Sequence, residues 1–328
     1  MKTRALLVTD VHTVELTDVE LPDPGPGEVR VRTAFSGISP GTELRKMSGV
    51  EGDGFPYIPG YSLTGTVESV GPGVTGLAVG TRVWCGGTRY ADHRRLWGGH
   101  IGVAVREQRS VVPLPDAVDP VAASIAKLAA ISYHGLRLAA PLPHETVAVI
   151  GLGPIGQCSA RVFAASGASV VAVDLSPERV ALAERAGIPG VVSKDGLARA
   201  VKTVFPDGAD IVVDCTGVAG VLAQAVEAAR ELPWDDQPVS GARLVVQGSY
   251  PDTFSLPYPT TFFRELRILV PRDHLMNDLR TVLDLMARGR LSLTELVSDL
   301  REPDAAQATY DELRTAKGGL VTAAFRWN

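Results

Sequence analysis

Three glycines in the middle of the chain have the spacing that binds a dinucleotide. Gly151, Gly153 and Gly156 follow the apolar run Val147–Ile150 and open a segment with helical periodicity. In a strand–turn–helix unit of this kind the first glycine permits the tight turn and the second lets the backbone approach a pyrophosphate. The third lets the helix pack closely on the strand, and the free N–H groups at the helix start hold the phosphates. The segment therefore predicts a phosphate-binding loop.

An acidic residue at the end of the next expected strand indicates which dinucleotide binds. Asp174 follows Gly156 by the roughly 20 residues that this fingerprint requires. Its carboxylate would accept hydrogen bonds from the ribose hydroxyls and repel a 2′-phosphate, which favours NAD over NADP. Two alternatives remain open: Arg179 could serve a 2′-phosphate, and Asp174 could simply cap the following helix. We interpret the cofactor as NAD.

Further cofactor contacts are expected at the carboxyl ends of later strands, because ligands of open parallel sheets bind there. Thr216 and Gly217 are expected to border the adenine, and Gly248 and Ser249 to meet the nicotinamide carboxamide. The complete set of expected cofactor residues is Gly151, Gly153, Pro154, Ile155, Gly156, Asp174, Leu175, Arg179, Thr216, Gly217, Gly248 and Ser249.

The elements that must position these residues indicate two domains of different kinds. The chain has 328 residues, and a domain typically has about 150. The first 120 residues are rich in glycine, proline and short β-branched runs. After Pro120, continuous apolar strands alternate with helices, which is typical of a parallel sheet covered on both faces. We predict an α/β protein with a β-rich domain (residues 1–120 and 273–328) and a Rossmann domain with a doubly wound parallel sheet (residues 121–272).

The patterns define individual elements. Helices are expected at Pro120–Ala140, Pro154–Ser166, Pro177–Ala186 and Leu279–Arg288. Strands are expected at Glu28–Thr33, Leu63–Val70, Thr146–Ile150, Ser169–Val173, Ile211–Asp214, Arg243–Gln247 and Leu320–Trp327.

Composition excludes several classes of function. The net charge of −5 argues against nucleic acid or an anionic membrane surface as the main partner, since both require a basic face. The three cysteines, Cys85, Cys158 and Cys215, are too few and too far apart for a four-thiolate zinc site or a disulfide framework. No apolar run is long enough for a membrane helix or a signal peptide. We expect a reduced, cytoplasmic protein with a small-molecule substrate.

Beyond the fingerprint, the chain resembles the medium-chain dehydrogenase/reductase superfamily over nearly its whole length. The likeness rests on Pro24–Val29, Val70–Val74, Gly80–Val83 and Val112–Pro115, followed by the Rossmann segment. It implies that the β-rich domain is a GroES-like catalytic domain. Near the C-terminus, Leu256–Pro259 and Phe263–Glu265 are most similar to bacteriochlorophyllide-type 2-hydroxyethyl dehydrogenases and to the related polyol dehydrogenases of secondary metabolism.

The same resemblance locates positions at which many members bind a catalytic zinc. Ser39 stands where a cysteine ligand would be, Gly60-Tyr61-Ser62 replaces the Gly-His-Glu segment, and Lys127 stands at the third ligand position. Serine, tyrosine and lysine are not a zinc-binding set, which requires imidazole, thiolate or carboxylate donors. The four-cysteine lobe of a structural zinc is also absent. We expect no metal.

Other groups must then handle the proton that accompanies hydride transfer. A lysine in a partly desolvated cleft can act both as an ammonium donor and as an amine base near neutral pH, so Lys127 is the first candidate. Tyr61 could donate its phenol to the same substrate oxygen, and Ser39 or Thr42 could relay a proton. The alternatives are a solvated helix residue for Lys127 and core packing for Tyr61.

Substrate contacts are expected from Glu43, His93 and Trp97. The resemblance also implies that Glu43, which follows Gly41-Thr42 where the family commonly keeps an acid, could buttress the site or the cofactor. Glu43 could instead be an ordinary acid at a helix start, and Trp97 part of a structural turn. His134 is expected to be packed in the core.

Together these features indicate a zinc-independent, NAD-dependent dehydrogenase that interconverts a secondary alcohol (cyclitol, sugar or hydroxyethyl type) and its ketone. The alternatives are an enone or quinone reductase and a dinucleotide-binding sensor without chemistry. Edge-to-edge pairing of two Rossmann sheets, through late strands expected near Val245 and at Ile268–Val270, would give a homodimer.

Overall fold

The computed structural model describes residues 1–50, 54–93, 97–234, 240–250, 252–315 and 320–327. The chain folds into two compact units: the first comprises Met1–Lys127 and Leu283–Asn328, and the second comprises Leu128–Val282. The chain passes from one unit to the other inside helix α3 (Ala126–Ala139) and again inside helix α9 (Met276–Ala287). Both boundaries lie several residues later than those we expected near residues 120 and 272.

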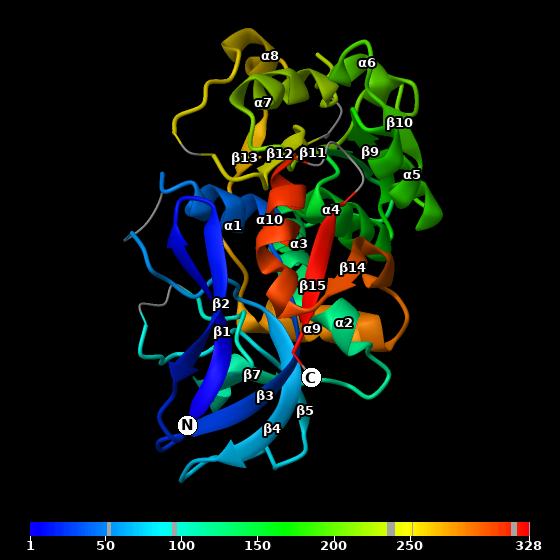
Figure 1. The fold of residues 1–328 in the computed structure, drawn as a ribbon. Helices are drawn as coiled ribbons and strands as arrows, with labels where there is room; N and C mark the ends of the chain where they lie inside the picture. The colour runs from blue at the N-terminus through cyan, green and yellow to red at the C-terminus, as the bar shows by residue number, and fades with distance from the viewer. Residues whose placement is uncertain (51–53, 94–96, 235–239, 251, 316–319, 328) are drawn as a thin grey trace. The chain divides into compact units, whose positions relative to one another are not determined.

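The second unit contains a six-stranded parallel sheet, as predicted (Figure 1). The strand order is β10-β9-β8-β11-β12-β13, so the order reverses between β8 and β11. In an open α/β sheet this reversal is where ligands bind, outside the carboxyl ends of the strands. The strands are β8 (Thr146–Ile150), β9 (Ser169–Asp174), β10 (Gly190–Val192), β11 (Ile211–Asp214), β12 (Arg243–Val246) and β13 (Arg267–Leu269).

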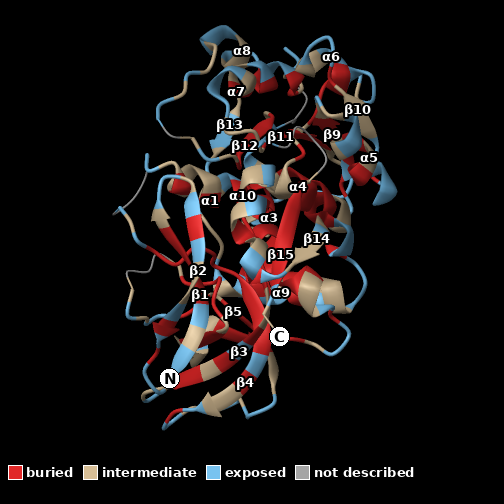
Figure 2. Ribbon diagram, in the orientation of Figure 1, coloured by how far each residue is buried: buried red, intermediate tan, exposed pale blue. Residues whose placement is uncertain are grey.

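Helices cover both faces of this sheet because every central strand is apolar on both sides. Ala148 and Ile150 pack with residues of α6 and α7, whereas Gly135 of α3 lies against Val245 on the opposite face. The central strands are buried along their length (Figure 2). The helices of the second unit are α4 (Pro154–Ala165), α5 (Pro177–Arg185), α6 (Leu197–Lys202), α7 (Ala219–Ala225), α8 (Tyr258–Phe262) and the 3₁₀ turn η2 (Val226–Ala228).

The first unit is built on a seven-stranded sheet that is largely antiparallel. Strand β3 is its centre and pairs with β15, β4 and β6, while the separate ribbon β1–β2 forms its own two-stranded sheet. The strands are β1 (Lys2–Asp10), β2 (Thr13–Glu20), β3 (Glu28–Gly37), β4 (Leu63–Val70), β5 (Arg82–Cys85), β6 (Val103–Glu107), β7 (Val111–Pro113), β14 (Val297–Arg301) and β15 (Thr322–Arg326).

Short helices border this sheet, namely α1 (Pro40–Met47), α2 (Pro120–Ala123), α10 (Ala306–Thr315) and the 3₁₀ turns η1 (Gln108–Ser110), η3 (Thr294–Leu296) and η4 (Pro303–Ala305). The single helix that we predicted for Pro120–Ala140 is wrong. It breaks at Ser124, whose hydroxyl donates to the carbonyl oxygen of Val121 at 2.7 Å and ends α2 before α3 begins. Among the described residues, no helix has the length and apolar character needed to cross a membrane.

Candidate functional site

The glycine-rich loop after β8 has the local geometry that a phosphate-binding loop needs. Gly151 has a φ of 83°, in the left-handed region that favours glycine. A Cβ on Gly156 would lie 1.7 Å from the carbonyl oxygen of Gly151, so helix and turn touch there. A Cβ on Gly153 would meet no atom within 4 Å. The backbone is thus open on the side where α4 begins with Pro154 and Ile155.

Asp174 ends β9 and faces this loop. Its Oδ2 accepts a hydrogen bond from the Leu152 N–H at 2.6 Å, and its Oδ1 accepts one from the Ser176 N–H at 2.8 Å. Arg179 Nη1 lies 4.0 Å from Oδ2. The next residue, Leu175, is exposed. The carboxylate is therefore placed beside the phosphate loop, with an arginine at its side.

The loops that follow β11 and β12 meet each other at the same edge of the sheet. A Cβ on Gly217 would lie 2.6 Å from the carbonyl oxygen of Ser249, and one on Gly248 would lie 2.5 Å from the Gly217 nitrogen. Asp214 joins them: its carboxylate accepts hydrogen bonds from the hydroxyls of Tyr250 and of the neighbouring threonine, Thr216. Burial raises the pKa of Asp214, although these hydroxyls oppose the shift. The structure thus gathers all the expected cofactor residues of this unit at the carboxyl ends of β8, β9, β11 and β12.

In the first unit, three of the predicted site residues form one cluster, which we call the Tyr61 cluster. The Lys127 Nζ lies over the face of the Tyr61 ring, 4.4 Å from its centroid. The Trp97 ring meets Tyr61 edge to face, with 5.3 Å between centroids. Tyr61 is buried, whereas Lys127 and Trp97 are partly exposed. A cation, a phenol and an indole wall are therefore side by side.

Ser39 and Thr42 lie at the start of α1 and are not part of these contacts of the Tyr61 cluster. Ser39 is the N-cap of α1, and its backbone N–H donates to Glu43 Oε1 at 2.7 Å. Thr42 is partly exposed in the first turn. His93 is partly exposed, with its Nε2 3.9 Å from Asp92 Oδ1, and the adjacent residues 94–96 lie outside the described residues.

Glu43 has a different environment from the substrate contact that we expected. Its side chain is 1% exposed. Its Oε2 accepts a hydrogen bond from the Tyr310 hydroxyl at 2.5 Å and lies 3.0 Å from His100 Nε2. The other ring nitrogen of His100, Nδ1, lies 2.7 Å from Ser36 Oγ, and the ring is fully buried. A carboxylate so enclosed positions its neighbours and is not accessible to a substrate.

The partners of Glu43 in this network could not be predicted, because they are far apart in the chain. Glu43 and Tyr310 are separated by 267 positions, and Ser36 and His100 by 64. The acid directly after Gly41-Thr42 was the local signal, and it indicated Glu43 alone.

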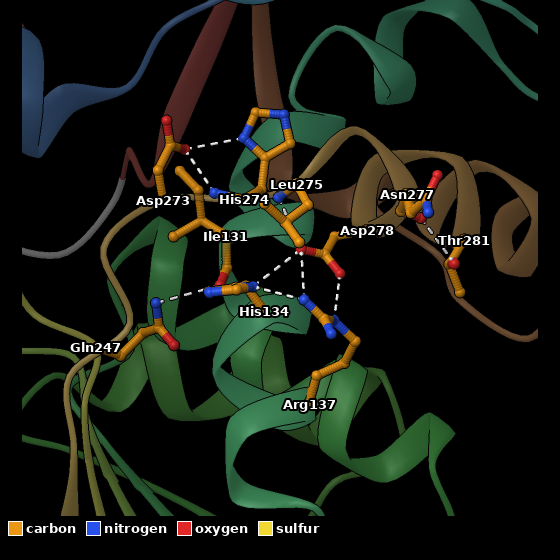
Figure 3. A network of polar contacts seen from close by, with 10 residues as sticks. All are labelled: Ile131, His134, Arg137, Gln247, Asp273, His274, Leu275, Asn277, Asp278 and Thr281. Atoms are coloured by element: carbon orange, nitrogen blue, oxygen red, sulfur yellow. Dashed lines mark hydrogen bonds and ion pairs between the residues drawn. The ribbon is translucent and has the colours of Figure 1, made fainter.

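A second polar network lies in the second unit and joins α3 to the start of α9 (Figure 3). Asp278 accepts hydrogen bonds from Arg137 Nε at 2.5 Å and from the Leu275 N–H at 2.8 Å, and His134 Nδ1 lies 3.0 Å from its Oδ2. Burial opposes the charge of Asp278, but these hydrogen bonds outweigh it and hold the pKa of the carboxyl below its usual value. His134 is thus not a core residue as expected, because its side chain is 18% exposed and bonded to a charged partner.

The residues at the expected zinc positions do not fit a zinc ion. Hydroxyl, phenol and ammonium groups are poor zinc ligands, and a lysine over the Tyr61 ring would repel a metal cation. Within the described parts of the chain, no group of three or more histidine, cysteine, aspartate or glutamate side chains is arranged to hold a metal. Burial also raises the pKa of Cys85 to about 11, which disfavours the thiolate that zinc requires. We derive no chemical step through zinc.

Comparison with known proteins gives two family models in the expected order. Residues 25–116 match the alcohol dehydrogenase GroES-like domain, and residues 154–288 match the zinc-binding dehydrogenase domain. Together the two models match more than half of the chain.

Individual relatives align over nearly the full length. The 2-desacetyl-2-hydroxyethyl bacteriochlorophyllide A dehydrogenase of Rhodobacter capsulatus is 29% identical over 94% of both chains. Among solved structures, 2R,3R-butanediol dehydrogenase from Bacillus subtilis superposes with a TM-score of 0.86 at 22% identity, covering 99% of this chain and 100% of that one. An Escherichia coli alcohol dehydrogenase complexed with NADH has a TM-score of 0.84 at 20% identity, covering 99% of both chains. The two domain models and the full-length relatives identify the chain as a member of the medium-chain dehydrogenase/reductase superfamily.

Proposed function

We propose that the protein is an NAD-dependent oxidoreductase that interconverts a secondary alcohol and its ketone without zinc. The observation that carries the proposal is the Tyr61 cluster, in which the Lys127 Nζ lies over the Tyr61 ring. The family resemblance implies that these two residues stand where many members bind zinc. The names of the relatives support the substrate class, since they describe dehydrogenases of a hydroxyethyl group and of a vicinal diol. Cyclitols, sugars and hydroxyethyl compounds are the substrates to test.

The phosphate loop fits NAD. Gly153 and the start of α4 would hold the pyrophosphate. The Asp174 carboxylate would accept hydrogen bonds from the ribose hydroxyls, and its negative charge would disfavour the 2′-phosphate of NADP. Thr216 and Gly217 would border the adenine, and Gly248 and Ser249 the carboxamide. NAD, when bound, supplies the chemistry of hydride transfer, while the protein supplies binding and proton transfer.

The proton chemistry falls to the first unit. In alcohol oxidation the Lys127 amine takes the hydroxyl proton at Nζ, and in ketone reduction the ammonium returns it. The Tyr61 ring face stabilises the ammonium through a cation–π contact. The partly exposed Trp97 ring would provide an apolar wall for the substrate. Ser39 is a candidate relay because its position is fixed by Glu43.

The test follows NADH formation over a panel of cyclitols, sugars and hydroxyethyl compounds for the native protein, Lys127→Ala and Tyr61→Phe. We expect native turnover with at least one compound and a loss of about a hundredfold or more in Lys127→Ala, since a hundredfold is the lower end of the range for one acid–base group. Lys202→Ala, which removes a lysine at the end of α6, is the matched control and should retain native turnover. Native turnover that survives Lys127→Ala would refute the assigned proton path.

Turnover of enones or quinones alone would favour a reductase of the same fold. Tight NADH binding without turnover of any compound would favour a sensor.

We also propose that the protein forms a homodimer through the edge of the second-unit sheet. Strand β13 is the last strand of that sheet, and Ile268 and Val270 beside it are 42% and 62% exposed. Apolar side chains along an unpaired edge favour pairing with a second copy.

A further inference from the structure

We propose that Glu43 and His100 form a positioning pair that holds the backbone of Ser39 and the Gly60-Tyr61 turn in place for alcohol turnover. This inference rests on the proposed function, because it concerns the residues assigned there to proton transfer. It concerns a buried acid and a buried histidine of the first unit, neither of which touches the substrate.

The first contact of the pair is between Glu43 and Ser39. The Ser39 N–H donates to Glu43 Oε1 at 2.7 Å, and Glu43 N–H donates back to the Ser39 carbonyl oxygen at 2.9 Å. Ser39 has no side-chain cap bond to α1. The Glu43 carboxylate therefore fixes the Ser39 backbone at the helix start.

The second contact of the pair is between His100 and the turn that contains Tyr61. A Cβ on Gly60 would lie 2.7 Å from His100 Cδ2 and 2.8 Å from its Nε2, so the ring packs directly against the Gly60 backbone. The backbone N–H groups of Gly99 and His100 also donate to the Pro59 carbonyl oxygen, at 3.0 and 2.9 Å. Gly60 itself has a φ of 78°, which together with this contact requires glycine.

The direction of the surrounding hydrogen bonds indicates which nitrogen of His100 carries the proton. The Trp327 indole can only donate, and it donates to Ser36 Oγ at 2.8 Å. The Ser36 hydroxyl hydrogen therefore needs an acceptor, and among the described residues that acceptor is His100 Nδ1, at 2.7 Å from Ser36 Oγ. His100 is then neutral with its proton on Nε2, which donates to Glu43 Oε2.

Glu43 is accordingly the carboxylate of the network. It accepts from three donors, namely the Ser39 N–H, the His100 Nε2–H and the Tyr310 hydroxyl. A protonated acid would leave at least one of them without an acceptor. Burial and the Glu43 charge both raise the pKa of Tyr310, as expected for a phenol beside a carboxylate.

The order Ser36–His100–Glu43 has the residue types of a hydrolytic triad, but it is not one. Ser36 and His100 are both fully buried, so the serine cannot reach a substrate. The network can therefore act only by fixing the segments that contact it. Its removal should loosen Ser39 and Tyr61 together while the fingerprint of the second unit remains intact.

The test compares Glu43→Gln, Tyr310→Phe and Gly60→Ala with the control Glu68→Gln, which removes a partly exposed acid that pairs with Arg32 on the same sheet. The amide of Glu43→Gln cannot accept from all three donors. We expect kcat for the alcohol to fall about tenfold or more, the effect of one lost charged hydrogen bond, with the KM for NAD nearly unchanged. Tyr310→Phe should have a smaller effect, and it remains informative if Glu43→Gln does not fold.

Nitrogen–proton NMR gives a readout that needs no turnover. In the native protein the His100 ring should show the neutral Nε2–H form, and the Ser39 amide and the Trp97 indole resonances should both move in Glu43→Gln and stay in Glu68→Gln. Resonances that stay in Glu43→Gln, or a kcat that is unchanged when they move, would overturn the positioning role. An inactive native protein whose resonances move would overturn the proposed function instead and leave the pair as a positioning device.

Discussion

At the scale of single residues, the proposed function depends on two charged side chains. Asp174 places a carboxylate beside the phosphate loop, whereas Lys127 places its Nζ over the Tyr61 ring. A negative group beside the ribose disfavours a second phosphate, and a positive group disfavours a metal ion. Both preferences follow from one side chain each and can be tested one at a time.

Replacing Asp174 by asparagine should weaken the preference for NAD. The amide keeps the size of the side chain but removes the charge that repels a 2′-phosphate, and Arg179 remains close by. We expect the ratio of kcat/KM for NAD over NADP to fall by about tenfold, which corresponds to roughly 1.4 kcal/mol. Glu178→Gln removes an exposed acid directly before Arg179 and should leave the ratio unchanged. An unchanged ratio in Asp174→Asn would refute the assigned role.

The sequence predicts the placement of residues well where they are local in the chain. The phosphate loop and Asp174 lie within one strand–helix–strand unit, so spacing alone predicts that they lie close together. The surroundings of Glu43 could not be predicted, because its partners His100 and Tyr310 come from distant parts of the chain. Such a network depends on how β3, β15 and α10 come together, which no local pattern contains.

At the scale of elements, helix starts connect the fold to the site. At the start of α4, a side chain on Gly153 would have free space, whereas one on Gly156 would collide with the Gly151 carbonyl oxygen. The two glycines, three residues apart, are therefore needed for different reasons. Strands β8 and β11 match the predicted ranges, because continuous apolar runs bounded by turns are reliable signals. A late strand was expected at Ile268–Val270, and β13 lies one residue earlier, whereas β10 and α10 were not predicted, since they are short or have weak apolar patterns.

Alanine at these two glycines should separate stability from cofactor binding. In Gly156→Ala the new Cβ meets the Gly151 carbonyl oxygen, so we expect a loss of about 1–3 kcal/mol in the free energy of unfolding. In Gly153→Ala there is space for the methyl group, so stability should be native while the Kd for NADH rises about tenfold. Urea unfolding and NADH fluorescence titration measure the two effects. Equal destabilisation by both variants would contradict this division of roles.

The Asp278 network should make stability depend on pH. Hydrogen bonds hold the folded-state pKa of Asp278 below its unfolded value, so its stabilisation is complete above the unfolded pKa and disappears as the pH falls through the folded pKa. Asp278→Asn should therefore be less stable than the native protein at pH 7, and the difference should shrink below about pH 4. Asp284→Asn, on the exposed side of α9, is the control. If the difference in the free energy of unfolding between the native protein and Asp278→Asn is the same at pH 3 and pH 7, the charge of Asp278 does not stabilise the fold.

At the scale of the whole molecule, the proposed function assigns a different part of the reaction to each unit. The second unit carries the dinucleotide fingerprint, and the first carries the Tyr61 cluster with its buried support. The two-domain α/β architecture was predicted from the change in sequence texture near residue 120. The domain boundaries were less accurate, because α3 and α9 each continue from one unit into the other without a break.

The assembly can be tested at the edge of the sheet. If β13 pairs with a second copy, Val270→Lys should shift the protein from dimer to monomer, because it places a charge on the exposed edge. Val204→Lys adds the same charge away from that edge and should leave the dimer intact. Sedimentation velocity distinguishes the two states. A native protein that sediments as a monomer would refute the proposed dimer.

Hydride transfer without zinc is the property that most clearly separates the proposed function from that of a zinc-dependent member of the superfamily. The most direct measurement is elemental analysis of the chelator-dialysed protein, followed by its turnover with NAD and the best alcohol of the panel. We predict zinc well below one equivalent per chain and a kcat equal to that of the untreated protein, with no gain on adding zinc. A kcat that disappears on dialysis and returns in proportion to added zinc would contradict the account.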